Sequence, residues 1–165
     1  MSGKWLEKFD GSEIRELIDL QSDHRIYSLV CALESRLDRK SGRSDCEELI
    51  LSICAFEREI NNGGFFQYLD NSSSHYAHRV TGDLAALGLQ ETADRVTKLF
   101  ALMGLRENPS YEEIQGIVRS GDWEDECPFD EQFEDFDDYF YDEVGDCSQQ
   151  LWPWILSNRE KIKLN

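Results

Sequence analysis

The feature that most constrains the fold is the spacing of five apolar residues inside the most acidic segment of the chain. Residues 122–146 contain thirteen Asp and Glu and no Lys or Arg, a composition that usually belongs to a solvated, unstructured run. Apolar residues nevertheless follow one another in this segment at intervals of 4, 3, 4 and 4: Phe129, Phe133, Phe136, Phe140 and Val144. Such intervals place side chains on one face of an α-helix. The pattern predicts a helix held to a core by its aromatic face.

The carboxylates of this helix are then expected to face water. Burial of a Phe side chain contributes roughly 1.5 to 3 kcal/mol, whereas a like-charge pair at i,i+4 opposes the helix by only roughly 0.2 to 0.5 kcal/mol. The aromatic face therefore outweighs the repulsion, and an unrelieved anionic surface results. The predicted surface consists of Asp122, Glu124, Asp125, Glu126, Asp130, Glu131, Glu134, Asp135, Asp137, Asp138, Asp142 and Glu143.

The overall charge limits the classes of partner. The 165 residues carry 34 Asp and Glu against 17 Lys and Arg, a formal net charge of -17. Such a chain is repelled by nucleic-acid phosphates and by anionic membranes, so neither is expected as a direct partner. An apolar share of 40% is enough to form a core, which separates this chain from highly charged disordered ones. The composition favours a folded protein with a basic partner.

The charge density of the acidic segment resembles that of DNA. Residues 130–143 would span about 20 Å as a helix at roughly 1.5 Å per residue and carry eight carboxylates. Duplex DNA presents one charge per roughly 1.7 Å, or about twelve over that length. Carboxylates held at this density present the field that the Lys and Arg side chains of a DNA-binding domain are placed to meet. Competition with DNA for a basic surface is therefore physically reasonable.

The rest of the chain predicts an all-α fold. Apolar residues recur at helical spacing, and runs of alternating or β-branched residues are missing. We expect a single domain over residues 1–165, a bundle of roughly seven to nine short helices with an acidic surface. Capping boxes predict two helix starts, formed by Ser44 with Glu47 and by Ser110 with Glu113.

Three further local features make specific predictions. The second helix is expected to begin near Ser22 or Asp23, which suit an N-cap. The segment Asn61-Asn62-Gly63-Gly64 predicts a helix stop and tight turn, whose backbone is bonded by polar side chains. Pro153 is expected in the first turn of the C-terminal helix, where proline is tolerated.

One block of the sequence resembles a known family. The residues are Glu59-Ile60-Asn61-Asn62-Gly63-Gly64-Phe65-Phe66-Gln67-Tyr68-Leu69-Asp70-Asn71-Ser72-Ser73, followed by Ala86-Leu87-Gly88-Leu89 and the helix that contains Ala93. They resemble a bacterial family of small all-helical proteins that is named for a DNA mimic protein of about nineteen kilodaltons. The acidic segment and the C-terminal helix also fall where that family has them. Acidity singles out the DNA mimic within the family, and this chain shares it.

The resemblance implies a cytoplasmic regulator. Such a protein occupies the DNA-binding face of a helix-turn-helix transcriptional repressor, relieves repression and acts as a homodimer. No motif of the family fixes which carboxylates make contact, so the choice of residues 122–143 rests on charge density. Weaker candidates are Glu57, Glu59, Glu112 and Glu113.

No pattern in the sequence indicates a cofactor, a metal site or an enzyme. His75 and His78 stand at i,i+3 without further ligands at a recognisable spacing, which favours a surface or capping role. An EF-hand loop counted from Asp122 would place Cys127 at its glycine position, which excludes that site. Five cysteines match no zinc or redox spacing and are expected to be reduced. Without an apolar stretch of signal-peptide length, a cytoplasmic location is expected.

Two other functions remain open at this point. An acidic binding module for a different basic partner, such as a histone-like or ribosomal protein, is barely separated from the DNA mimic by sequence. A carboxylate-dependent enzyme is less favoured, because carboxylates on a solvated face lack the burial that raises a catalytic pKa.

Overall fold

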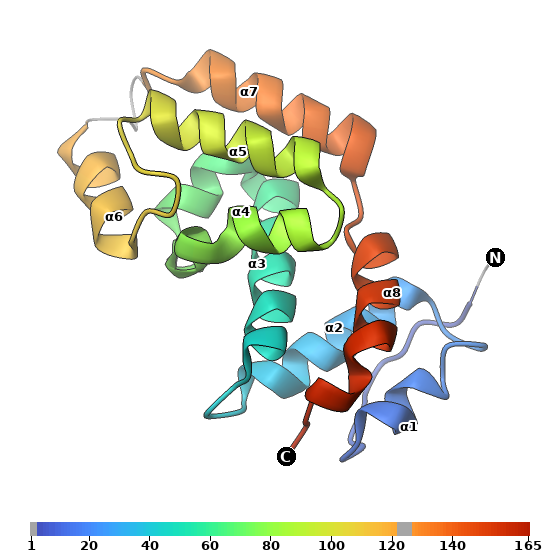
Figure 1. Cartoon of the computed structure of the whole chain (residues 1–165). Coiled ribbons are helices and arrows are strands. Elements are labelled where there is room, and N and C mark those ends of the chain that lie inside the picture. The colour runs from blue at the N-terminus through green and yellow to red at the C-terminus, as the bar shows by residue number, and fades with distance from the viewer. Residues whose placement is uncertain (1–2, 122–126) are drawn as a thin grey trace. The chain divides into compact units, whose positions relative to one another are not determined.

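Helices account for the regular structure of this chain in a computed structural model that describes residues 3–121 and 127–165 (Figure 1). Within these residues there are eight α-helices and no β-strand, so the all-α prediction and the expected number of helices are confirmed. The helices are α1 (Ile14–Ile18), α2 (Ile26–Asp38), α3 (Asp45–Asp70), α4 (Ala77–Ala86), α5 (Gln90–Leu102), α6 (Tyr111–Ser120), α7 (Asp130–Tyr139) and α8 (Ser148–Asn158). Two 3₁₀ turns (η1, Ser72–Tyr76; η3, Arg159–Lys161) and one π-helical turn (η2, Phe140–Val144) complete the elements.

The chain divides into two compact units. The first unit contains residues 1–54 and 146–165, and the second contains residues 55–145. The boundary falls within α3, so the start of that helix belongs to the first unit and the remainder to the second. The prediction that residues 1–165 form one domain stays a prediction.

Both capping boxes are present. In α6 the backbone N–H of Glu113 donates to Ser110 Oγ at 3.3 Å, and the N–H of Ser110 donates to the Glu113 carboxylate at 2.7 Å. At the start of α3 the N–H of Glu47 donates to Ser44 Oγ at 3.4 Å, and the N–H of Ser44 donates to the Glu47 carboxylate at 2.8 Å. These starts are local in origin, because each needs only two side chains three residues apart.

Two predicted positions in the first unit are wrong. Helix α2 begins at Ile26 rather than near Ser22, because the backbone of Asp23 and Arg25 pairs with that of Lys4 at 2.8 and 2.9 Å and so cannot enter the helix. Pro153 is the sixth residue of α8 and not in its first turn. The helix starts early because the side chain of Asp146 accepts a hydrogen bond from the N–H of Ser148 at 2.8 Å.

The first unit buries one carboxylate at the start of α3. Glu47 is fully buried, and Lys40 Nζ lies 2.7 and 2.8 Å from its two oxygens. The backbone N–H of Lys163 donates to the same carboxylate at 2.7 Å. Burial alone would raise the pKa of Glu47, but the hydrogen bonds from Lys40 and from the backbone outweigh it and hold the pKa below its ordinary value. This carboxylate therefore joins the helix start to the C-terminal segment.

Replacing Lys40 tests the value of this contact. Lys40→Met leaves the Glu47 carboxylate buried without its cation, and we expect it to lower the free energy of unfolding by about 2 to 4 kcal/mol at pH 7. Without Lys40, burial raises the pKa of Glu47 in the folded variant, so the carboxyl group takes up a proton as the pH falls and the loss should shrink from pH 7 toward pH 4. Urea denaturation from pH 4 to pH 7 measures both effects.

Lys8→Met is the matched control for that prediction. Lys8 pairs with Asp10 at 2.8 Å, but both side chains are highly exposed, so we expect a change of less than about 0.5 kcal/mol. Equal losses in the two variants would show that Lys40 contributes no more than an ordinary surface pair.

Candidate functional site

Helix α7 is held in the second unit by its phenylalanines. Phe133, Phe136 and Phe140 are buried, as predicted. The Phe65 ring lies 5.3 Å from that of Phe133 and 5.2 Å from that of Phe136, and the Phe56 ring lies 5.8 Å from that of Phe140, as measured between ring centroids. These are the distances of favourable tilted and edge-to-face aromatic pairs.

The two ends of the predicted aromatic face are less enclosed. Phe129, which precedes α7, and Val144, in the π-helical turn η2, are half-buried. Hydrogen bonds also join η2 and the glycine after it to α3. The Tyr141 hydroxyl donates to the carbonyl of Ile60 at 2.7 Å, and the Asn61 amide donates to the carbonyl of Gly145 at 3.3 Å. Aromatic packing and hydrogen bonds thus fix this segment from Phe133 to Gly145.

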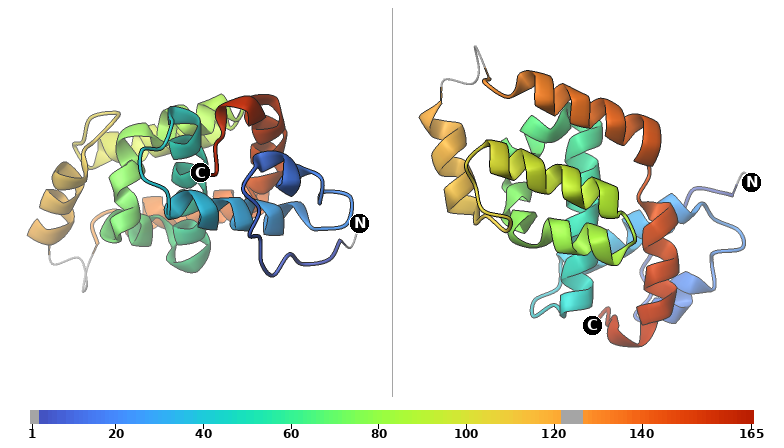
Figure 2. Two further views of the ribbon diagram at one scale, coloured as in Figure 1. Left: turned by 90° about the horizontal axis from the view of Figure 1, so that it is seen from below. Right: turned by 45° about the horizontal axis from the view of Figure 1, so that its top comes forward.

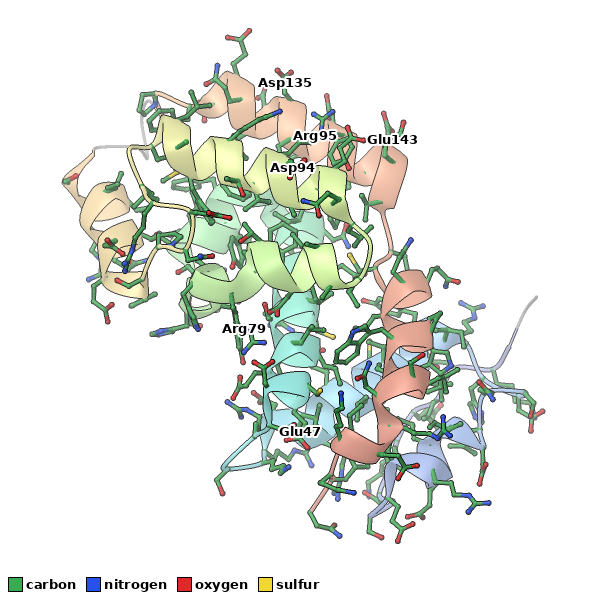
Figure 3. The ribbon with its side chains drawn as sticks, viewed as in Figure 1. Glu47, Arg79, Asp94, Arg95, Asp135 and Glu143 are labelled. Atoms are coloured by element: carbon green, nitrogen blue, oxygen red, sulfur yellow. The ribbon has the colours of Figure 1, made fainter. Side chains whose placement is uncertain are left out.

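Seven carboxylates on the outer side of this segment face water. We call them the acidic face: Asp130, Glu131, Glu134, Asp135, Asp138, Asp142 and Glu143, all exposed. Among the residues that the structure describes, none of the seven has a Lys, Arg or His nitrogen within 4.0 Å. Asp135 and Glu143 are labelled in Figure 3. The negative charge of the face is therefore unrelieved by local ion pairs.

Asp137 does not share this environment, and the prediction that it faces water is wrong. Its side chain is half-buried and accepts a hydrogen bond from the backbone N–H of Phe65 at 2.8 Å. Burial, more than the nearby charges of Asp138 and Glu134, raises the pKa of Asp137 to about 6, against the lowering effect of that hydrogen bond. The sequence holds a sign of this, because Asp137 stands four residues after Phe133 and three before Phe140, on the aromatic stripe itself.

Asp137 reaches the backbone at a kink in α3. The helix is interrupted at Gly63 and Gly64, and Gly64 has φ 79° and ψ -173°, a conformation almost restricted to glycine. The Asp137 carboxylate occupies the place that a Cβ on Gly64 would take. The predicted helix stop is thus a kink between two helical stretches. The polar group bonded to its backbone comes from α7, not from the turn's own side chains.

The polar residues around the kink bond to one another. Glu59 is buried, and its carboxylate accepts hydrogen bonds from Gln67 Nε2 at 2.8 Å, Asn71 Nδ2 at 2.7 Å and Ser73 Oγ at 2.7 Å. Burial alone would raise the pKa of Glu59, but these three donors outweigh it and lower the pKa. The Glu59 carboxylate therefore joins three other polar side chains of the block of residues 59–73.

The weaker candidates fall into two groups. Glu57 and Glu59 are buried, so the structure excludes them from an exposed surface. Glu112 and Glu113 are exposed, but Glu113 also caps α6 and pairs with Arg106 at 2.9 Å. The predicted residues Asp122, Glu124, Asp125 and Glu126 lie outside the described residues.

Helix α5 contributes two carboxylates that the sequence reasoning missed. It lies beside α7 in both Figure 1 and the right view of Figure 2. Glu91 and Asp94 are exposed on α5, and Asp94 is labelled in Figure 3. The spacing of residues gave no indication of them, because it does not show that α5 and α7 are neighbours.

The two histidines that the sequence singled out make local contacts in the described part of the chain. The His75 ring stacks on Tyr111 at 3.8 Å between centroids, and His78 Nδ1 lies 2.7 Å from the carbonyl of His75. No group of three or more His, Cys, Asp or Glu side chains that could hold a metal ion occurs among the described residues. In the same residues, no helix has the length and apolar character needed to cross a membrane.

Comparison with known proteins gives one match. The model of the family described as DMP19-like protein matches residues 43–158, which extend from the start of α3 to the end of α8. No curated protein and no solved structure matches the chain.

Replacing Gly64 tests the close approach of α7 to the kink. Gly64→Ala places a methyl group on the Asp137 carboxylate at a positive φ, and we expect it to lower the free energy of unfolding by about 2 to 4 kcal/mol. Gly82→Ala, in α4 with open space around the added methyl, should instead raise it by about 0.5 to 1 kcal/mol. Thermal unfolding followed by circular dichroism compares the two. A small loss in Gly64→Ala would mean that the kink adapts freely.

The raised pKa of Asp137 predicts a pH dependence. A carboxyl group whose pKa is higher in the folded than in the unfolded state lowers stability as the pH rises from about 4 to about 6. Asp137→Asn removes this effect and retains an oxygen that can accept from the N–H of Phe65. We expect the variant to match the wild type near pH 4 and to be more stable by about 1 to 2 kcal/mol at pH 7.

Asp138→Asn is the control for Asp137→Asn, since its exposed carboxylate lies one residue along the same helix. Urea denaturation between pH 4 and pH 8 should show a much smaller pH-dependent gain in this control. A lower stability of Asp137→Asn at pH 7 would contradict the prediction. It would show that the charged hydrogen bond to Phe65 outweighs the cost of burial.

Proposed function

This chain belongs to the DMP19-like protein family, and from that premise we propose that it is a DNA mimic. The acidic face binds the DNA-binding surface of a helix-turn-helix transcriptional repressor, blocks its access to operator DNA and so relieves repression. The homodimer and the cytoplasmic location that the sequence resemblance implies are part of the same proposal.

One observation carries the proposal: seven exposed carboxylates, none with a Lys, Arg or His nitrogen within 4.0 Å among the described residues, lie on a segment that buried phenylalanines hold in place. Over the about 20 Å of residues 130–143 this gives one charge per about 3 Å, against roughly 1.7 Å for duplex DNA. Glu91 and Asp94 on the neighbouring α5 add to the charge. The field is thus of the same order as that of a phosphate backbone.

Fixed positions distinguish this surface from a disordered acidic tail. A flexible tail loses conformational entropy on binding, whereas carboxylates on a packed helix lose mainly side-chain freedom. Arg and Lys side chains form charge-assisted hydrogen bonds to carboxylates as they do to phosphates. A protein whose basic side chains are arranged for DNA therefore meets acceptors of the same charge at comparable spacing.

The experiment has two steps. Proteins captured from a lysate of the source organism on the immobilised chain are identified by mass spectrometry, and each captured DNA-binding protein is purified and bound to its labelled operator fragment. This chain is then titrated into the gel shift. We expect free operator to appear as the chain is added, and to appear less readily as salt rises from roughly 50 to 200 mM.

Amide variants identify the face. Changing Glu134, Asp135, Asp138 and Asp142 together to Gln or Asn should raise the concentration needed for displacement at least about tenfold, since several charged contacts are lost. A control variant changes four exposed acids elsewhere, Glu7, Asp19, Asp38 and Glu107, and should compete as the wild type does. Relief of like-charge repulsion should also stabilise the first variant by about 1 kcal/mol at low salt.

Two outcomes would overturn the proposal. If every captured DNA-binding protein stays on its operator at a large excess of this chain, the chain does not act as a DNA mimic. Capture of basic proteins that bind no specific DNA would then favour the acidic binding module. If the two amide variants compete equally, the acidic face is not the surface used.

A further inference from the structure

A groove between α5 and α7 stands out from the acidic face beside it. Its volume is about 450 Å³, and Leu99, Leu102 and Phe136 supply its apolar lining. Leu99 and Phe136 are buried in the core, whereas Leu102 is 56% exposed, more than Trp5, Tyr27 or Tyr141. An exposed leucine at the edge of a groove is not explained by an imitation of phosphate charge.

The charged residues that line the groove nearly cancel. Arg95 pairs with Glu91 at 2.9 Å, and its guanidinium carbon lies 3.9 Å from the centre of the Tyr139 ring. Lys98 lines the groove together with Asp94 and Asp135. Two cations thus stand against three carboxylates, and Figure 3 shows Asp94 and Arg95 on α5 facing the helix that carries Asp135. The groove itself offers little attraction to a cation.

We propose that this groove receives an apolar side chain of the DNA-binding partner, one that the partner carries between its basic side chains. The inference rests on the proposed function and adds to it the kind of side chain that the groove selects. Elements that read DNA combine Arg and Lys contacts with apolar contacts to the methyl group of thymine. On this chain Leu102 would offer the apolar contact that the methyl group offers in DNA. The carboxylates on either side would offer the charged contacts that the phosphates offer.

Charge complementarity favours an apolar side chain with basic neighbours over an uncharged apolar ligand. Asp135 of the acidic face lies on the α7 side of the groove, and Asp94 lies on its α5 side. Basic side chains next to the apolar one are therefore attracted to both sides, while Lys98 and Arg95 disfavour a cation in the middle. The charged contacts weaken as salt rises, whereas the apolar contact does not. Affinity for such a partner should have a component that survives high salt.

The test uses two synthetic helix-forming peptides of one Lys- and Arg-rich sequence, which differ only in a central Leu or Ser. Binding to the full chain is measured by fluorescence anisotropy at roughly 0.1 and 0.5 M salt. We expect the Leu peptide to bind about tenfold more tightly than the Ser peptide, as partial burial of one Leu side chain implies. This ratio should persist at the higher salt although both affinities fall.

Two variants test whether the preference for the Leu peptide arises in the groove. In Leu102→Ser the preference for the Leu peptide should fall to within about twofold, and the fold should be retained because Leu102 is exposed. Ala101→Ser changes the neighbouring exposed residue, which does not line the groove, and should leave the preference intact. Equal binding of the two peptides, or a Leu preference that survives in Leu102→Ser, would overturn the inference.

The outcomes separate this inference from the proposed function. If operator DNA is released in the gel shift but the peptides bind equally, the inference about the groove is wrong and the DNA mimic stands. If the Leu peptide is preferred but no DNA-binding protein is displaced from its operator, the proposed function fails. The DNA-binding partner assigned to the groove then fails with it. The amide variant of the acidic face should bind both peptides more weakly by a similar factor, so that the ratio of the two affinities is retained.

Discussion

The packing of Phe65 against the phenylalanines of α7 is the contact on which the rest of the acidic face depends. Phe133 and Phe136 lie 5.3 and 5.2 Å from it. Each buried ring contributes roughly 1.5 to 3 kcal/mol, whereas each like-charge pair along the helix costs roughly 0.2 to 0.5 kcal/mol. This difference in free energy allows seven carboxylates, which form no ion pair with the described residues, to remain on an ordered helical segment. Without the rings, the same composition would form a solvated run.

The part of the structure that depends on local sequence was predictable. The intervals between Phe133, Phe136 and Phe140 indicated the buried face of α7, and the two capping boxes marked helix starts. Two predictions failed because a distant segment intervened: the backbone of Lys4 delays the start of α2, and the N–H of Phe65 binds the Asp137 carboxylate. The place of Pro153 was missed for a local reason, the hydrogen bond between Asp146 and Ser148. The acids of α5 could not be placed beside α7 because no periodicity reports which helices are neighbours. The sequence thus predicted which face of a helix is buried, but not which helices pack against each other.

At the kink, the absence of a side chain on Gly64 and the position of the Asp137 carboxylate depend on each other. Gly64 leaves the space in which the Asp137 side chain sits, and that side chain satisfies the N–H that the interrupted helix leaves open at Phe65. Seventy-two residues separate the two ends of this hydrogen bond. The turn that looked self-contained in the sequence is therefore completed by the acidic helix. One of the acids in that helix belongs to the fold rather than to the surface.

Except for Asp137, the side chains that anchor α7 and those that carry its surface charge are different residues on opposite sides of the helix. Substitutions on the outer side therefore leave the core untouched, and removal of a charge there even relieves repulsion. Such a surface can drift quickly in evolution while the helix keeps its place. A lineage could exchange one basic partner for another through a few surface substitutions, with no need to find a new fold.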